Sequence, residues 1–206
     1  MSVGSIVGVA GLVLAAGGGT RMGQPKATIL VDGRTLAARS VAALHAAGIA
    51  PVRVVLGAGA EQVLVAGSLE LAEVLINQDW VSGMASSLRC GLADWSVPAV
   101  LIVLVDVPEL PAAVVARLVD TWRQGALAVV ATYDGEQGHP VLLDGSVLTE
   151  VADAAIGDSG AKRWLGEHTE LVVGVPCSDI GKPDDLDTPT DLARWHDSQI
   201  APHLRS

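Results

Sequence analysis

A glycine-rich segment near the start of the chain carries residue types that suit phosphate chemistry. It reads LAAGGGTRMGQPK and spans residues 14–26. Gly17, Gly18 and Gly19 permit unusual backbone angles and close approach of a ligand, and their N–H groups can form a hollow that binds anions. Arg21 and Lys26 add two cations to the same short segment. Together these residues predict a binding site for the triphosphate of a nucleotide.

Two commoner phosphate-binding motifs do not fit this segment. The Walker loop ends in Gly-Lys-Ser/Thr, whereas this chain has Gly23-Gln24-Pro25-Lys26. The dinucleotide fingerprint has two residues between its second and third glycines, and three residues separate Gly19 from Gly23. An ordinary flexible turn is the remaining alternative. The two cations and Pro25, which stiffens the approach to Lys26, favour the phosphate site.

Asp106 directly follows the most apolar run of the chain, residues 99–105. A carboxylate at the end of a buried strand is costly unless it is paired, and a metal ion removes that cost. Mg²⁺ prefers one or two carboxylates together with phosphate oxygens and water. We therefore expect Asp106 to bind Mg²⁺ and to take part in catalysis. The alternative is that Asp106 caps the helix expected at residues 112–124.

Apolar runs alternate with stretches of helical spacing along most of the chain. We expect strands at residues 5–15, 51–56, 73–76, 99–105, 127–132 and 171–176. We expect helices at residues 34–47, 60–66, 85–95 and 112–124, and a last one after Thr188. Continuous apolar runs are typical of parallel strands buried on both faces. The pattern predicts a three-layer, Rossmann-like α/β fold with a mostly parallel central sheet.

Ligands of such sheets bind at the carboxyl ends of the strands. The informative segments are therefore the ones that follow strands, which are residues 16–26, 77–87, 106–108 and 133–140.

Composition narrows the classes of function. The chain has 206 residues, is half apolar and 17% charged, so we expect one folded domain over residues 1–206. Its net charge of −10 argues against a nucleic-acid or membrane-surface partner. Cys90 and Cys177 lie far apart and are expected to be free thiols. The longest apolar run, residues 6–16, is too short for the ~20 residues of a membrane span and follows no basic segment. We expect a soluble, cytoplasmic protein.

The ordered motifs of the chain resemble those of the MobA-like nucleotidyltransferases. LAAGGGTRMGQPK resembles the signature LAAG-x-G-x-RMG-x-x-K of that family. Later segments resemble the family in the same order: NQDWVSGMASSLRCGL at residues 77–92, LVDVP at 104–108, GHPVLL at 138–143, GDSGAK at 157–162 and DLDTPTDL at 185–192. The subgroup most similar to this chain is the molybdenum cofactor cytidylyltransferases.

The resemblance implies a fold of the nucleotide-diphospho-sugar transferase type and a defined reaction. CMP would pass from CTP to molybdopterin with release of pyrophosphate and with Mg²⁺ as cofactor. A molybdoenzyme or its maturation chaperone would be a partner. Val107 and Lys162 depart from the usual Gln and Arg of the subgroup, which leaves the acceptor open. The alternatives are a guanylyltransferase using GTP, or transfer to another phosphorylated acceptor such as a sugar phosphate.

The resemblance also implies roles for individual residues. Arg21 and Lys26 would hold the triphosphate and offset charge on the leaving pyrophosphate. The backbone at Leu14, Ala15 and Ala16 would lie under the base, with Ser86 and Ser87 supplying polar contacts.

The resemblance also implies that Asp187 binds the metal ion and that His139 binds the acceptor. Asp187 would be the second metal ligand, with Asp185 as the fallback, because Thr188 can cap a helix that starts at Pro189. His139 would contact the acceptor, although a lone histidine is more often structural. A Ser-His-Asp hydrolase is disfavoured because the chain has no G-x-S-x-G elbow.

Overall fold

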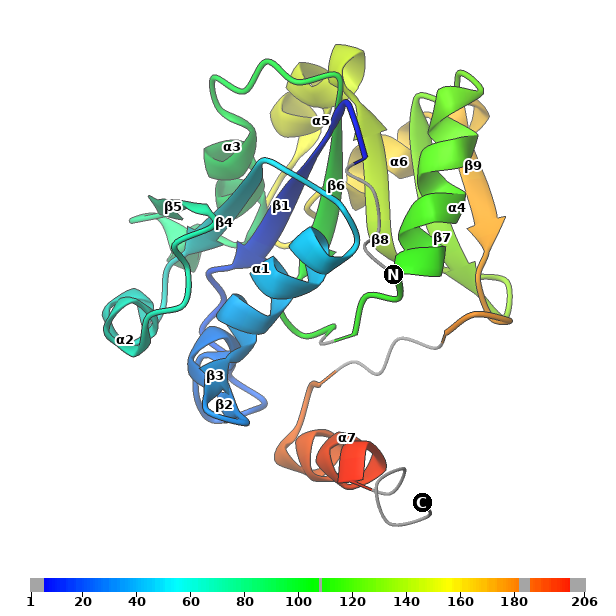
Figure 1. Ribbon diagram of the computed structural model, residues 1–206. Coiled ribbons are helices and arrows are strands. Elements are labelled where there is room, and N and C mark those ends of the chain that lie inside the picture. The colour runs from blue at the N-terminus through cyan, green and yellow to red at the C-terminus, as the bar shows by residue number, and fades with distance from the viewer. Residues whose placement is uncertain (1–5, 108, 182–185, 201–206) are drawn as a thin grey trace.

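A seven-stranded sheet forms the centre of the computed structural model, which describes residues 6–107, 109–181 and 186–200, with side chains up to residue 195. Its strand order is β5-β4-β1-β6-β8-β7-β9 (Figure 1). The strands are β1 (Val9–Ala15), β4 (Val52–Leu56), β5 (Glu73–Ile76), β6 (Ala99–Leu104), β7 (Ala128–Tyr133), β8 (Glu136–Asp144) and β9 (Val172–Pro176). Two short strands, β2 (Leu30–Val31) and β3 (Arg34–Thr35), form a separate ribbon.

The strands that carry the glycine segment and Asp106 are central neighbours. β1 pairs in parallel with β4 on one side and with β6 on the other. β5 continues the parallel half, and β7 and β9 are also parallel to each other. Leu14 and Leu104 are register partners near the carboxyl ends of β1 and β6. The segments that follow these two strands therefore begin side by side, as the predicted mostly parallel sheet requires.

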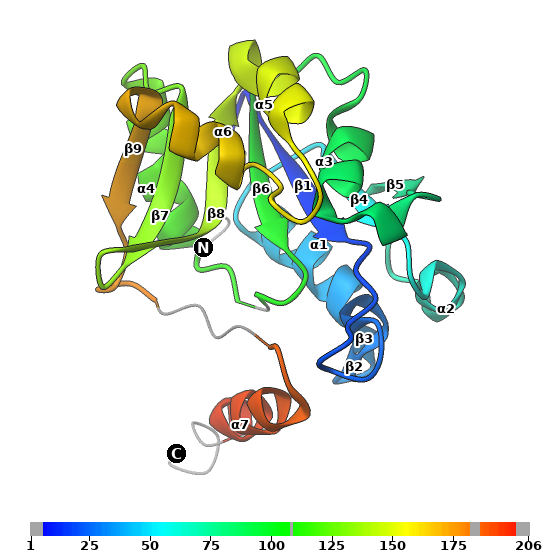
Figure 2. The same ribbon diagram turned by 180° about the vertical axis from the view of Figure 1, so that it is seen from behind.

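Helices cover both faces of the sheet (Figures 1 and 2). One buried cluster includes Leu44 of α1 (Leu36–Ala46) and Leu118 of α4 (Ala112–Arg123). The other cluster includes Leu88 of α3 (Met84–Leu92), Val151 of α5 (Leu148–Ala154) and Trp164 of α6 (Lys162–Glu167). Two apolar layers on opposite faces of one sheet make the three-layer α/β fold that the sequence predicts. The remaining helices are α2 (Ala60–Ala66) and α7 (Pro189–Ile200).

Several element boundaries differ from the expected ones. The first strand begins at Val9, since Gly8 lies in a turn with φ of +88°. The helix expected from residue 34 begins at Leu36, because residues 34–35 form β3 and Thr35 caps the helix by accepting a hydrogen bond from the Ala38 N–H. The helix expected over residues 85–95 runs from Met84 to Leu92.

The segment at residues 133–140 is not the loop that we expected. It is a hairpin in which β8 pairs antiparallel with both β7 and β6. Asp134 and Gly135 make the turn with φ of +53° and +88°, the conformation that Asp-Gly favours between antiparallel strands. This correction places residues 138–140 inside the sheet rather than on a loop at its edge.

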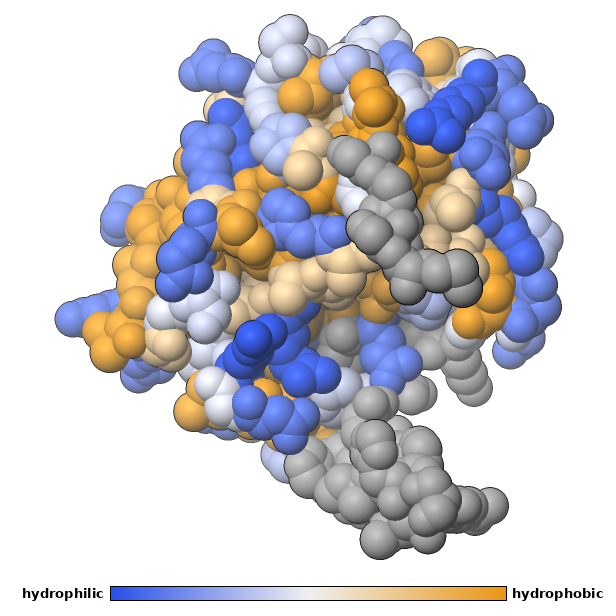
Figure 3. Space-filling model, viewed as in Figure 1, coloured by the Kyte–Doolittle hydropathy of each residue, from blue (hydrophilic) through white to orange (hydrophobic). Residues whose placement is uncertain are grey.

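The edge of the sheet beside β5 exposes apolar side chains. Figure 3 shows apolar surface around α2 and β5, where the exposed fraction reaches 84% at Val65 and 41% at Ile76. None of the helices that the structure describes is long and apolar enough to span a membrane.

Candidate functional site

The glycine segment folds back on itself directly after β1. Gly19 has φ of +64°, and a Cβ atom there would lie 1.9 Å from the carbonyl oxygen of Gln24. Only glycine fits such a close approach. A Cβ at Gly18 would lie 3.1 Å from the ring of Trp80, so the indole covers this part of the loop. The fold-back leads into the short 3-10 turn Lys26–Thr28, which presents Lys26 at the sheet edge.

Four charged side chains meet beside this loop. Lys26 Nζ donates to Asp106 Oδ2 at 2.9 Å and to Asp187 Oδ1 at 2.6 Å. Arg21 donates to the other oxygen of Asp187. The exposed fraction is 14% for the Lys26 side chain and 75% for Arg21. The structure therefore brings together the two cations and two carboxylates that the sequence singles out.

The electrostatics keep Lys26 and Asp187 ionised. Burial lowers the pKa of Lys26, but hydrogen bonds to Asp187 and Asp106 outweigh that effect and raise it above its ordinary value. The hydrogen bond from Lys26 is the main reason that the pKa of Asp187 lies below its ordinary value. At neutral pH Lys26 and Asp187 are therefore a charged pair.

Backbone contacts explain why Asp187 reaches Asp106. The N–H of Leu186, a fully buried residue, donates to the carbonyl oxygen of Asp106 at 2.9 Å. Thr188 and Asp191 then cap α7 reciprocally, each side chain accepting from the other residue's backbone N–H. The predicted cap at Thr188 is confirmed, and it leaves the Asp187 side chain to the site. Asp185, the fallback ligand, lies outside the described residues.

The two carboxylates fit a divalent cation. Asp106 Oδ1 is buried and has no hydrogen-bond partner among the described residues, which is costly for a carboxylate oxygen unless a ligand binds it. Mg²⁺ is usually held in proteins by one or two carboxylates and completes its shell with phosphate oxygens and water. No group of three or more metal-ligating side chains exists in the described part of the chain. Asp106 and Asp187 are the two carboxylates that Lys26 brings together here, and their role as metal ligands stays a prediction.

A pocket of about 450 Å³ opens over this cluster. The predicted residues that line it are Leu14, Ala16, Gly17, Gly18, Gly19, Arg21, Lys26, Ser87, Asp106 and Asp187. Ala15 is buried in β1 and does not line it. The lining combines apolar residues such as Leu14 with charged residues such as Lys26, which suits a ligand with an aromatic and an anionic part.

Ser86 lies behind the wall of the pocket rather than on it. Its hydroxyl accepts from the Asn77 side-chain amide at 2.8 Å and lies within hydrogen-bond distance of the carbonyl oxygens of Asp79 and Gly83. Ser87 accepts from the same amide at 3.0 Å and does line the pocket. The geometry therefore gives Ser86 a role in fixing residues 77–83 and leaves only Ser87 positioned to touch a ligand.

His139 does not line the main pocket. It borders a cavity of about 10 Å³ together with Ser40 and Glu109, and its Nδ1 is buried with no partner among the described residues. Burial lowers the pKa of His139, against the raising influence of the Asp106 charge. A neutral imidazole is a poor phosphate ligand, so the structure gives no support to a phosphate contact. A contact with the rest of the acceptor stays a prediction.

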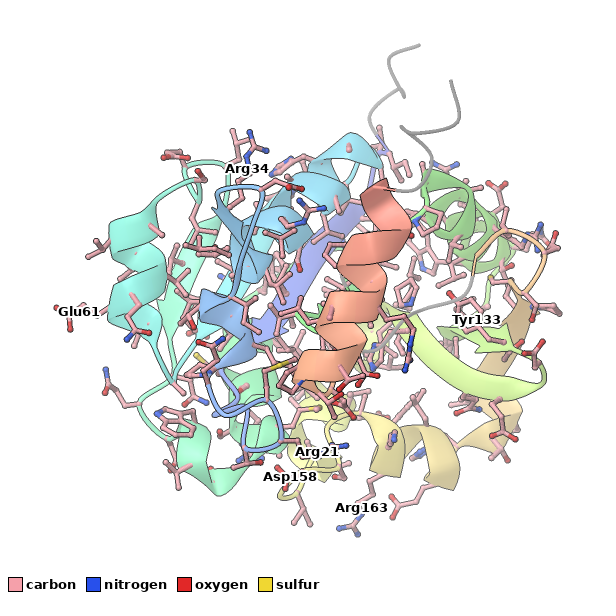
Figure 4. All side chains as sticks on the ribbon, turned by 90° about the horizontal axis from the view of Figure 1, so that it is seen from below. Arg21, Arg34, Glu61, Tyr133, Asp158 and Arg163 are labelled. Carbon is pink, nitrogen blue, oxygen red and sulfur yellow. The ribbon has the colours of Figure 1, made fainter. Side chains whose placement is uncertain are left out.

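Several residues that line the pocket were not among the predicted site residues. Trp80, Val81, Met84 and Asp158 line it, and Figure 4 shows Arg21 and Asp158 together at one rim. Asp158 Oδ1 accepts from the Met84 N–H at 3.3 Å, at the start of α3. The segments at 77–92 and 157–162 contain all four, so the family motifs marked the segments but not the individual contacts.

Known proteins share the fold and much of the sequence. The model of the MobA-like NTP transferase domain matches residues 11–172. The chain is 36% identical over 194 residues to nicotine blue oxidoreductase of Paenarthrobacter nicotinovorans, with 90% of this chain and 95% of that protein covered. It is 32% identical over 127 residues to a probable molybdenum cofactor guanylyltransferase of Opitutus terrae, with 62% of each covered.

Solved structures agree with these matches. The homologue of Mycobacterium tuberculosis Rv0371c from Mycobacterium sp. strain JC1 superposes with a TM-score of 0.82 at 29% identity, covering 94% of this chain and 97% of that one. Rv0371c of M. tuberculosis H37Rv in complex with manganese gives a TM-score of 0.75 at 26% identity, covering 92% and 98%.

The three-layer fold, with the glycine loop and an aspartate at neighbouring strand ends, defines a nucleotidyltransferase-type protein. The chain belongs to the MobA-like NTP transferase family. The resemblance seen in its sequence motifs is thereby confirmed at the level of the family.

Proposed function

We propose that this protein transfers CMP from CTP to molybdopterin and releases pyrophosphate. The observation that carries the proposal is the cluster at the sheet edge, in which Lys26 bonds Asp106 and Asp187 beside the glycine loop. Cations and carboxylates in one pocket can serve a reaction between two phosphate groups, because both the triphosphate and the attacking phosphate are anions.

Different residues of the chain have different roles in this reaction. Gly17, Gly18 and Gly19 bind the triphosphate through backbone N–H groups, while Arg21 and Lys26 offset charge on the leaving pyrophosphate. The acceptor phosphate oxygen attacks the α-phosphorus in line with the leaving oxygen, so positioning supplies much of the rate. Asp106 and Asp187 would hold the divalent cation that reduces repulsion between the two anions; we propose Mg²⁺ for this role.

The same pocket accommodates the remaining parts of the substrates. Leu14, Ala16 and Ser87 also line the pocket, and they would contact the base. A guanylyl transfer from GTP, or transfer to another phosphorylated acceptor such as a sugar phosphate, would use the same charged cluster. Use of the product by a cytoplasmic molybdoenzyme or its maturation chaperone belongs to the same proposal.

A second candidate function is reduction of an aromatic heterocycle. It is favoured by the 36% identity to a nicotine blue oxidoreductase across 90% of this chain, and by the apolar lining at Trp80, Val81 and Met84. Against it stands the glycine loop, whose spacing differs from the dinucleotide fingerprint. The cluster of two cations and two carboxylates also has no evident role in hydride transfer.

Thermal unfolding with CTP, GTP, ATP and UTP, each with and without Mg²⁺, tests the first proposal. A nucleotide at about 100 times its dissociation constant adds about 2.7 kcal/mol, or roughly 5–10 °C at this size. A Mg²⁺-dependent shift with CTP alone, followed by pyrophosphate release when molybdopterin is added, supports cytidylyl transfer. A shift selective for GTP redirects the proposal to guanylyl transfer. Consumption of NADH or NADPH with nicotine blue, and no pyrophosphate release, favours the second candidate.

A further inference from the structure

Lys26 acts as the shared counter-ion of the two carboxylates. Its ammonium bonds Asp106 Oδ2 and Asp187 Oδ1 at once, at 2.9 and 2.6 Å. The two bonds join segments 80 and 161 residues away from Lys26 in the sequence. The ammonium therefore lies between the two side chains whose donor set fits a divalent cation.

A cation bound by both carboxylates would have to take an oxygen of Asp187 that Lys26 or Arg21 already bonds. Asp106 Oδ1 is the carboxylate oxygen of the pair that no described residue bonds; the second oxygen of Asp187 accepts from Arg21. An ammonium and a divalent ion cannot share one place between two carboxylates, because they repel each other there. Lys26 and the cation must therefore compete.

We propose that Lys26 is a built-in competitor of the divalent cation, which keeps the two carboxylates closed to a free ion until the phosphates of a nucleotide draw its ammonium away. This inference rests on the proposed function, since it needs a ligand that carries phosphates. Lysine suits the exchange because its ammonium is a compact charge on a flexible four-carbon stem. The phosphate-binding hollow lies on the same loop, so a short swing of that stem suffices.

The consequence is an order of binding. A free divalent ion has to displace the Lys26 ammonium and therefore binds weakly. When the ion binds together with a triphosphate, the phosphates bind the displaced ammonium, and the ion binds more tightly. Metal and nucleotide then favour each other's binding reciprocally. The carboxylates are meanwhile held close together, because without Lys26 their charges would repel.

The test measures binding of Mn²⁺ alone by electron paramagnetic resonance, with no nucleotide present. Lys26→Gln should bind Mn²⁺ roughly tenfold more tightly than the wild type, a factor that corresponds to about 1.4 kcal/mol. Arg123→Gln is the matched control, since it removes an equal charge from the last turn of α4, where Arg123 is exposed and paired with Asp120. Lys26→Arg keeps a cation in place and should bind Mn²⁺ as weakly as the wild type.

Equal or weaker Mn²⁺ binding by Lys26→Gln would overturn the inference, as would equal tightening in Arg123→Gln. Circular dichroism spectra establish that each variant is folded before binding is measured. Adding a non-hydrolysable CTP analogue gives a second readout: it should tighten Mn²⁺ binding strongly in the wild type and weakly in Lys26→Gln. The metal-only measurement is independent of turnover, so failure of the proposed reaction and failure of this inference are distinguishable.

Discussion

Replacing Asp106 with asparagine is expected to stop nucleotidyl transfer and to leave the fold in place. The change removes the charge that Lys26 contacts at 2.9 Å, but Lys26 keeps its bond of 2.6 Å to Asp187. The lost charge-assisted hydrogen bond costs about 1.5–3 kcal/mol. Asparagine keeps a polar atom at the buried position of Oδ1, which no described residue bonds, so no stability is regained there. The loss therefore stays near the cost of one hydrogen bond, and the melting temperature should fall by roughly 5–10 °C.

Turnover should respond very differently from stability. Loss of one group that stabilises charge in a transition state typically costs about 10²–10³ in kcat. Pyrophosphate release and thermal unfolding, measured on the same preparation, separate the two effects. Asp179→Asn is a suitable control, because Asp179 is an exposed carboxylate paired with Arg117. Wild-type turnover in Asp106→Asn, or a melting temperature lowered by more than about 10 °C, would refute the reasoning.

Three further predictions concern the same site. Lys26→Ala should weaken nucleotide binding by roughly 10–100-fold, the worth of a charge-assisted hydrogen bond, as titration calorimetry would show; unchanged affinity would remove Lys26 from the phosphate site. Because Lys26 holds the pKa of Asp187 below 3.8, this pair stabilises the fold above that pH and is lost as the pH falls through the lowered value. Unfolding curves of wild type and Asp187→Asn should therefore converge only in strong acid, and convergence near neutral pH would contradict this. Gly57→Ala would place a Cβ 2.6 Å from Trp80 Cβ and should cost about 1–3 kcal/mol of unfolding free energy. Gly17→Ala, where a Cβ meets nothing within 4 Å, should be much milder in the same thermal unfolding measurement.

The parallel half of the sheet could be predicted because its strands are buried on both faces. β1 and β6 are continuous apolar runs, and β4 is interrupted only by the buried Arg53; such runs are the pattern expected of central parallel strands. β8 could not be found in this way, because it starts with polar residues and contains Pro140, which interrupts strand patterns. The Asp134-Gly135 pair was the available signal, since Asp-Gly between two strands favours a hairpin.

The sequence predicted which residues form the site, but not which of them bond each other. Residue types and their places after strands pointed to Arg21, Lys26 and Asp106, and the family resemblance added Asp187; the structure brings these four together. Nothing in the sequence shows that one ammonium bonds both carboxylates, because that depends on how the chain after β9 returns to β6. The rotation of α3 about its axis likewise determines that Ser87 lines the pocket and that Ser86 does not.

The cluster joins positions 161 residues apart, and this matters while the chain is being synthesised. β1, β4, β5 and β6 are complete once residue 104 has emerged, and the glycine loop precedes three of them. A nascent chain can therefore present Arg21 and Lys26 to polyanions well before Asp187 exists to neutralise them. Until then Asp106 is the carboxylate that can pair with Lys26, and Arg21 gains its partner only when Asp187 has been added.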